Sequence, residues 1–83
     1  MNVDHEVTLL IKEIQRLGEK DSTGRYVVKF GVLALDDHCA QIFEAIVGTL
    51  KAAKKKKVVD FKAEILLHPT HKDVDIVLLK DSL

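Results

Sequence analysis

Apolar residues near the start of the chain recur at helical spacing. Six of them fall on one face of a helix: Val3, Val7, Leu10, Ile11, Ile14 and Leu17. The opposite face is charged or polar, as in a surface helix that packs on a core. Asn2 can cap the first turn, and Gly18 follows the last apolar position, where helices commonly stop. The pattern predicts a helix over residues 3–17.

The following stretch predicts three short elements. Residues 19–24 are polar and end in Ser-Thr-Gly, which is typical of a turn. Residues 26–30 are mostly β-branched or aromatic, which favours a strand. Residues 31–35 are too few to show a period, and we interpret them as one or two helical turns.

A second apolar stripe predicts one long helix that begins at Asp36-Asp37. Its members recur at i, i+3, i+4, i+7, i+8 and i+11: Cys39, Ile42, Phe43, Ile46, Val47 and Leu50. Two carboxylates open the segment and a run of lysines closes it, which is the charge order that the helix dipole favours.

Beyond the lysines the apolar period changes to two. Residues 58–61 suggest the start of a strand, residues 64–67 and 74–79 suggest two strands, and the polar segment 68–73 suggests a turn. The chain thus predicts a terminal β-hairpin. Helix, short strand, short helix, long helix and hairpin is the order of a winged helix, so we expect an α+β fold that is winged-helix-like. It would have three helices and a small antiparallel β-hairpin wing, in a single domain over residues 1–83. Its expected core includes Leu10, Ile14, Ile42, Phe43, Ile46, Leu50 and Ile76.

Composition narrows the classes of function. With 83 residues and 47% hydrophobic residues, the chain suits one small domain with its own core. The net charge is zero, with a balance of −3 in residues 1–50 and +3 in residues 51–83, so any basic function is local. A single cysteine allows no internal disulfide. The sequence shows no signal peptide and no apolar run of about 20 residues, so we expect a cytoplasmic protein without membrane contact.

Two candidate chemistries have weak support. Cys39 lies on the apolar stripe, and Asp36 and Asp37 beside it would raise the thiol pKa, so we interpret it as a core residue rather than a nucleophile. His68 and His71 are separated by a proline and lack a cysteine pair, so we interpret them as exposed turn residues rather than zinc ligands. We therefore expect no enzymatic activity, no cofactor, no metal and no small-molecule substrate.

The lysine run is the feature that a binding function can use. Lys51, Lys54, Lys55, Lys56 and Lys57 place five positive charges around one helix end. One interpretation is a solvated helix end whose charges complement the dipole. The other is a binding surface for an acidic protein partner, and we treat these five lysines as the candidate partner-binding residues.

A nucleic-acid-binding winged helix is the alternative function. Such a protein reads DNA with residues near the start of its long helix. Here that end carries Asp36 and Asp37, with Glu44 further along, and these carboxylates would repel phosphates. The sequence disfavours nucleic acid as a partner.

Several segments resemble the costars family. The most distinctive are Asp-Asp-His-Cys-Ala at residues 36–40 and Phe-Glu-Ala-Ile-Val-Gly-Thr-Leu-Lys-Ala-Ala-Lys at residues 43–54. Residues 1–7, 28–33, 64–67 and 73–79 are also similar to the family. The chain departs from the family pattern at Ala34-Leu35, at Ala63 and in the turn at His68–His71, so we expect a differently shaped wing tip.

The resemblance implies a winged-helix-like fold, no enzymatic activity and a role in actin dynamics and cell motility. It suggests a free-standing member, related to a domain that ends a larger actin-binding, Rho-activating muscle protein. We therefore expect a monomeric, cytoplasmic, cytoskeleton-associated protein that binds actin or an actin-regulatory protein. Whether that partner is monomeric actin, the filament or an accessory regulator stays open, as does the binding face.

Overall fold

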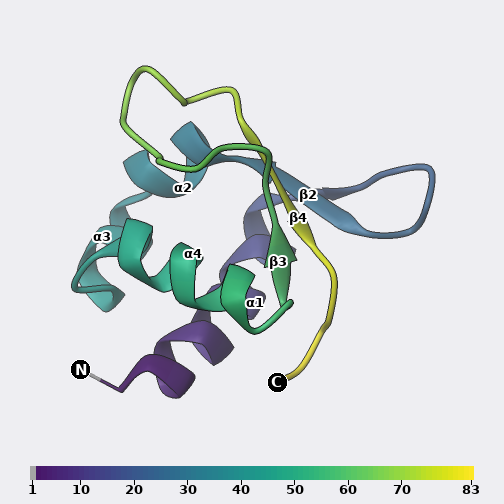
Figure 1. The fold of residues 1–83 in the computed structure, drawn as a ribbon, viewed down its shortest axis with the longest axis horizontal. Helices are drawn as coiled ribbons and strands as arrows, with labels where there is room; N and C mark the ends of the chain where they lie inside the picture. Colours follow the sequence, from purple (N-terminus) through teal and green to yellow (C-terminus); the bar gives the residue numbers. More distant parts are fainter. Residues whose placement is uncertain (1) are drawn as a thin grey trace.

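The computed structural model describes residues 2–83, which form four helices and a four-stranded antiparallel sheet (Figure 1). Along the chain the elements are α1 (Val3–Leu17), β1 (Glu19–Lys20), β2 (Tyr26–Lys29), α2 (Phe30–Leu35), α3 (Asp37–Ile42), α4 (Ile46–Lys55), β3 (Val59–Asp60) and β4 (Asp75–Leu78). The sheet order is β1-β2-β4-β3. The predicted α+β class is confirmed. Met1, which opens one of the segments similar to the costars family, lies outside the described residues.

Helix α1 forms as the apolar pattern predicts. The side chain of Asn2 accepts a hydrogen bond from the backbone N–H of His5 at 3.1 Å, so the predicted cap is present. Gly18 ends the helix because it allows a close approach of the chain. A Cβ atom there would lie 2.7 Å from the carbonyl oxygens of both Ile14 and Val27. Glycine therefore lets β2 run against the end of α1.

The polar segment after α1 is more ordered than a plain turn. Glu19 and Lys20 pair with Val27 and Tyr26, so β1 and β2 form a hairpin. Its turn is held by the side chain of Asp21, which accepts from the Thr23 backbone N–H at 2.8 Å and hydroxyl at 2.6 Å. The expectation of a turn over residues 19–24 is correct only for its second half.

The expected long helix is broken into two helices. Phe43 and Ala45 have extended backbones, with φ/ψ of −109°/132° and −150°/100°, so α3 ends at Ile42 and α4 begins at Ile46. The break lets α3 pack against α2 while α4 packs against α1. Both halves keep the same apolar spacing, which is why the period alone predicted one helix. The prediction of three helices is wrong for this reason.

The expected terminal hairpin is also wrong. Strand β4 forms as predicted, but it pairs with β2 on one edge and with β3 on the other. Residues 64–67 form no strand, because neither edge of β4 is left for them to pair with. They belong instead to a connection over residues 61–74 that crosses α2 (Figure 1). The predicted wing is therefore not confirmed: β4 pairs with β3 and with β2 within one sheet.

The core lies between the sheet and the helices. Four of the seven predicted core residues, Leu10, Ile14, Leu50 and Ile76, are fully buried, and Phe43 is 6% exposed. Ile42 and Ile46 are partly buried and pack against this core. Among the helices of residues 2–83, none combines the length and the apolar character needed to span a membrane.

Candidate functional site: the lysine-rich end of α4

Helix α4 ends in a motif built from backbone hydrogen bonds. The Val58 N–H donates to the Ala53 carbonyl at 2.9 Å, and the Lys57 N–H donates to the Lys54 carbonyl at 3.0 Å. These are the two bonds of a Schellman motif, whose residue after the cap adopts a left-handed conformation. That residue is Lys57, with φ of 59°. The motif ends α4 after Lys55 and turns the chain away from the helix at Lys57.

Lys54 serves the fold rather than the surface. Its Nζ donates to the carbonyl oxygen of Phe61 at 2.6 Å and lies 4.3 Å from the centre of the Phe61 ring. It also lies 3.5 Å from the Ala63 carbonyl oxygen. The ammonium group therefore satisfies backbone carbonyls in the chain that leaves β3, and it contacts an aromatic face. Sequence reasoning treated Lys54 as solvated, whereas the structure half-buries it.

Lys56 has a charged partner on α1. Its Nζ lies 3.0 Å from an Asp4 carboxylate oxygen, and both side chains are largely exposed. Such a surface pair contributes little to stability, at most about 1 kcal/mol. It does neutralise part of the positive charge at this helix end.

Three lysines of the run remain available to a partner. Lys51, Lys55 and Lys57 are exposed, and none takes part in an ion pair within residues 2–83. The backbone N–H of Lys80 reaches the Val58 carbonyl oxygen at 3.3 Å, which brings a fourth exposed lysine to this end. Sequence reasoning missed Lys80, since only the pairing of β4 with β3 places it there. We call Lys51, Lys55, Lys57 and Lys80 the lysine surface.

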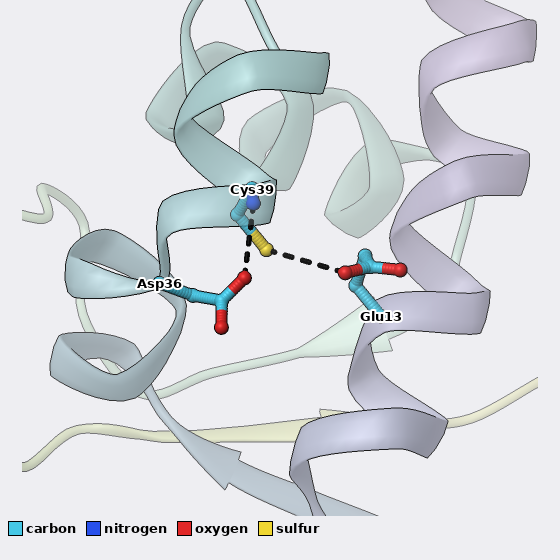
Figure 2. A group of neighbouring side chains, drawn as sticks. All are labelled: Glu13, Asp36 and Cys39. Carbon is cyan, nitrogen blue, oxygen red and sulfur yellow. Dashed lines mark hydrogen bonds between the residues drawn. The ribbon is translucent and has the colours of Figure 1, made fainter.

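A second group of polar side chains joins α1 to α3. Figure 2 shows Glu13, Asp36 and Cys39, whose possible ligand atoms lie within 4.8 Å of one another. Arg16 already supplies positive charge there, with a guanidinium nitrogen 2.7 Å from Glu13 and 2.6 Å from Asp36. His38 Nδ1 lies 3.1 Å from the same Glu13 oxygen. Both carboxylates are already bonded to Arg16, an arrangement that favours a structural network.

The electrostatics of this network fit a structural role. Burial alone would raise the pKa of Glu13, but hydrogen bonds from Arg16 and His38 outweigh it and lower that pKa. The backbone N–H of Cys39 is the main cause of the lowered pKa of Asp36. Both carboxyl groups are therefore stabilised in their charged form.

Cys39 is poorly suited to nucleophilic or metal chemistry. Burial, and then the adjacent Asp36, raise the pKa of its thiol to about 12. A reactive cysteine requires the opposite shift. The thiol is 1% exposed, and its Sγ lies 3.8 Å from a Glu13 oxygen. The prediction of a small core residue with a raised pKa is confirmed.

The two histidines of the 61–74 connection lie apart from these groups. His71 Nδ1 accepts a hydrogen bond from the Leu67 backbone N–H at 3.0 Å, so one ring nitrogen shapes the turn. His68 is exposed. Within residues 2–83, the one group of three possible metal ligands within 4.8 Å contains neither histidine.

The break between α3 and α4 and the nearby carboxylates bear on the nucleic-acid alternative. The predicted reading helix is interrupted at residues 43–45, so it presents no continuous face to a groove. Asp36, at its start, caps α3 and bonds to Arg16, and Asp37 and Glu44 are exposed. These features add to the charge argument against nucleic acid.

Comparison with known proteins decides the family. A model of the Costars family matches residues 2–79. The chain belongs to the Costars family. This confirms the resemblance that the sequence segments carry.

Family members and one solved structure align along nearly the whole chain. The chain is 62% identical over 81 residues to the Costars family protein ABRACL of Homo sapiens, covering 98% of this chain and 100% of that protein. It is 63% identical to the Costars family protein v1g158749 of Nematostella vectensis, covering 98% and 99%. The solution structure of human HSPC280 protein has a TM-score of 0.87 at 60% identity, covering 96% of this chain and 94% of that one. The fold described above is therefore similar to one already solved.

Proposed function

We propose that this chain is a non-enzymatic protein-binding module that regulates the actin cytoskeleton and cell motility, by contact with actin or an actin-regulatory protein. The observation that carries this proposal is its membership of the Costars family over residues 2–79. The resemblance of its sequence to that family implies such a role. Under this proposal the protein works in the cytoplasm, as a monomer associated with the cytoskeleton.

The lysine surface is the contact that we propose for this partner. Lys51, Lys55 and Lys57 are exposed and carry no ion pair within the described chain, so their charge can act at a distance. A positive surface of this kind suits a partner that presents an acidic surface. Complementary charge mainly speeds and steers the encounter of two proteins, and it adds less to the final affinity. The surface therefore suits a rapid, salt-dependent association.

The character of the side chains supports the proposal of a non-enzymatic role. Cys39 is buried, with a thiol pKa raised to about 12, and the Glu13 and Asp36 carboxylates are bonded to Arg16. A general acid–base pair needs two groups whose environments move their pKa values apart. Here the pKa values of both carboxyl groups are lowered together. The network favours a fixed structure over proton transfer.

Sedimentation with actin tests the proposal directly. The full chain is mixed with filaments and centrifuged, and in parallel with monomeric actin on a size-exclusion column. Both experiments are repeated with purified actin regulators present. We expect the protein to move with actin in at least one condition. Its failure to move with actin, alone or together with any regulator, would reject the proposal.

A further inference from the structure

A hollow lined by apolar side chains lies where α2, α3 and the start of α4 meet (Figure 1). It has a volume of about 360 Å³, and Glu44 is the one charged residue among the nine that line it. Cys39 and Phe43 of this lining are buried, whereas Ala40 and Ala45 are exposed, so the hollow opens to solvent. We call it the α3–α4 hollow.

Hydrogen bonds fix the walls of the α3–α4 hollow. The carboxylate of Asp36 accepts from the Cys39 backbone N–H at 3.0 Å, and the Phe43 N–H donates to the Cys39 carbonyl at 3.1 Å. The carbonyl of Ala45 accepts from both the backbone N–H and the hydroxyl of Thr49, at 3.0 and 3.3 Å. The break between α3 and α4 is therefore held on both sides, and the hollow exists before a partner binds.

One face of α4 leads from the hollow to the lysine surface. Val47 lines the hollow, and Lys51 and Lys55 follow it at intervals of four residues, so all three lie on the same face of the helix. Gly48 is also exposed on this face and has no side chain to obstruct a partner. With a rise of about 1.5 Å per residue, the two lysines lie about 6 and 12 Å along the helix from Val47. The hollow and these lysines are thus parts of one exposed surface.

The charges on this surface differ from one end to the other. Glu44 borders the hollow, and Asp37 is exposed on α3, one turn before Ala40. Lys51 and Lys55, at the other end, take part in no ion pair within residues 2–83. Acidic groups of a ligand are therefore repelled near the hollow and attracted along α4. This arrangement fits a ligand that is apolar at one end and acidic at the other.

We propose that a segment of the partner protein docks along this face, with an apolar side chain in the α3–α4 hollow and acidic side chains opposite Lys51 and Lys55. In a helical segment the acidic residues then lie about four and eight positions from the apolar one. This docking deepens the proposed function and rests on it, because it takes the lysine surface as the contact with the partner. The hollow adds apolar burial, which slows dissociation, whereas the lysines mainly speed the encounter.

Peptide selection tests this docking without actin. A phage library of random dodecapeptides is panned against the folded full-length chain, and biolayer interferometry gives the rates at which the selected synthetic peptides associate and dissociate. Ala40→Glu places a charge in the hollow. Gln41→Glu is the matched control, since Gln41 is the exposed neighbour on α3 and does not line the hollow. Lys51→Glu/Lys55→Glu tests the lysine end. Circular dichroism and urea unfolding establish that each variant is folded, and Ala45→Glu replaces Ala40→Glu if that variant is not.

We expect the selected peptides to combine a large apolar residue with acidic residues on one side of it. Ala40→Glu should weaken their binding roughly tenfold or more, mainly by faster dissociation, because the apolar contact is lost. Gln41→Glu, which changes the net charge equally, should leave binding within roughly twofold. Lys51→Glu/Lys55→Glu should slow the association of the same peptides roughly tenfold.

Three results would overturn the proposal. They are no enrichment of such peptides, equal effects of Ala40→Glu and Gln41→Glu, and peptides that respond to a change at only one end of the surface. Because actin is absent, these results are separate from the sedimentation experiment. Failure here together with binding to actin refutes the docking mode alone. Success here without binding to actin supports the docking surface and rejects the proposed role at actin.

Discussion

Lys57 occupies a backbone conformation that suits glycine better. Its φ of 59° is in the left-handed region, where a Cβ atom costs about 1–2 kcal/mol, while glycine adopts this region freely. The two Schellman bonds, from its own N–H and from that of Val58, keep the residue there. We expect Lys57→Gly to raise the free energy of unfolding by about 0.5–1 kcal/mol, after the greater entropy of glycine in the unfolded chain is subtracted.

Urea unfolding measures this effect, with Lys55→Gly as the matched control. Lys55 lies in the last turn of α4, where helical geometry is normal, so glycine should lower stability by up to about 1 kcal/mol. Opposite shifts of the two midpoints are the expected result. Shifts in the same direction would contradict the role assigned to the left-handed residue.

Lys54 and Lys55 are neighbours with different roles. Lys54 bonds to the Phe61 carbonyl at 2.6 Å and contacts the Phe61 ring, whereas Lys55 is exposed. We expect Lys54→Ala to lower the free energy of unfolding by about 1–2 kcal/mol, because a charge-assisted hydrogen bond and a cation–π contact are lost. Lys55→Ala should change it by less than about 0.5 kcal/mol. Equal effects of the two substitutions, measured by urea unfolding, would disprove this distinction.

At the scale of the element, Phe43 lies at the break between α3 and α4, where it follows the last residue of α3. Its side chain is 6% exposed and belongs to the core, while its backbone is extended. We expect Phe43→Ala to lower the free energy of unfolding by about 3–5 kcal/mol, a large share of the stability of a small domain. The exposed Leu35 provides the control, since Leu35→Ala removes little buried surface. A urea midpoint that both substitutions leave unchanged would refute the core assignment.

The network of Glu13 and Asp36 between α1 and α3 makes the free energy of unfolding depend on pH. The pKa values of Glu13 and Asp36 are lowered on folding from the ordinary values of 4.5 and 3.8. Groups with a lowered pKa contribute stability that is complete above the ordinary pKa and is lost as pH falls through the folded value. The wild type should therefore lose stability below about pH 4.5, as each carboxylate takes up a proton.

Substitution of Arg16 tests the origin of this dependence. In Arg16→Gln the buried Glu13 keeps the effect of burial, which raises its pKa, and the hydrogen bond from His38, which lowers it, but loses the guanidinium that lowers it further. The loss of stability between about pH 5 and pH 3 should become smaller or change sign. Thermal unfolding across that pH range measures the loss of stability. Arg25→Gln, at an exposed arginine, is the control. An unchanged pH profile in Arg16→Gln would show that the network does not couple to folding.

The elements that the sequence predicted well are those decided by local signals. Helix α1 has a single apolar face and an N-cap at Asn2. Strands β2 and β4 and helix α2 form where their residue types favour them. The errors concern competition between distant segments. Residues 64–67 have strand-forming residues, but β2 and β3 occupy both edges of β4. The break at Phe43 depends on tertiary packing, because α3 packs against α2 while α4 packs against α1. The spacing of apolar residues does not reveal which helix each segment packs against.

At the scale of the whole molecule, a zero net charge hides an uneven surface. The five lysines that stand together in the sequence separate in the structure into one that serves the fold, one paired with Asp4, and three that are exposed. Sequence spacing identified the candidate surface but not which of its lysines are exposed and unpaired in the described chain. Lys80 joins them through the pairing of β4 with β3, about 25 residues away in the chain, which no local signal reveals. The lysine surface is therefore smaller than the run but includes a residue from outside it.

A charge-reversal variant tests whether this surface sets partner association. The variant carries Lys51→Glu, Lys55→Glu and Lys57→Glu and leaves Lys54 intact, because Lys54 supports the fold. The matched control reverses three exposed lysines elsewhere, so its net charge is the same: Lys12→Glu, Lys20→Glu and Lys62→Glu. Circular dichroism and urea unfolding establish that both variants are folded.

The decisive measurement is the rate of association with the actin species that binds in sedimentation, followed by stopped flow over a range of salt. For the variant of the lysine surface we expect association at least about tenfold slower than for the wild type, with a flatter salt dependence. The control should be slowed much less, since its charges lie outside the contact. Equal rates for the two variants, or no change in either, would contradict the claim that this lysine surface brings the protein to its partner.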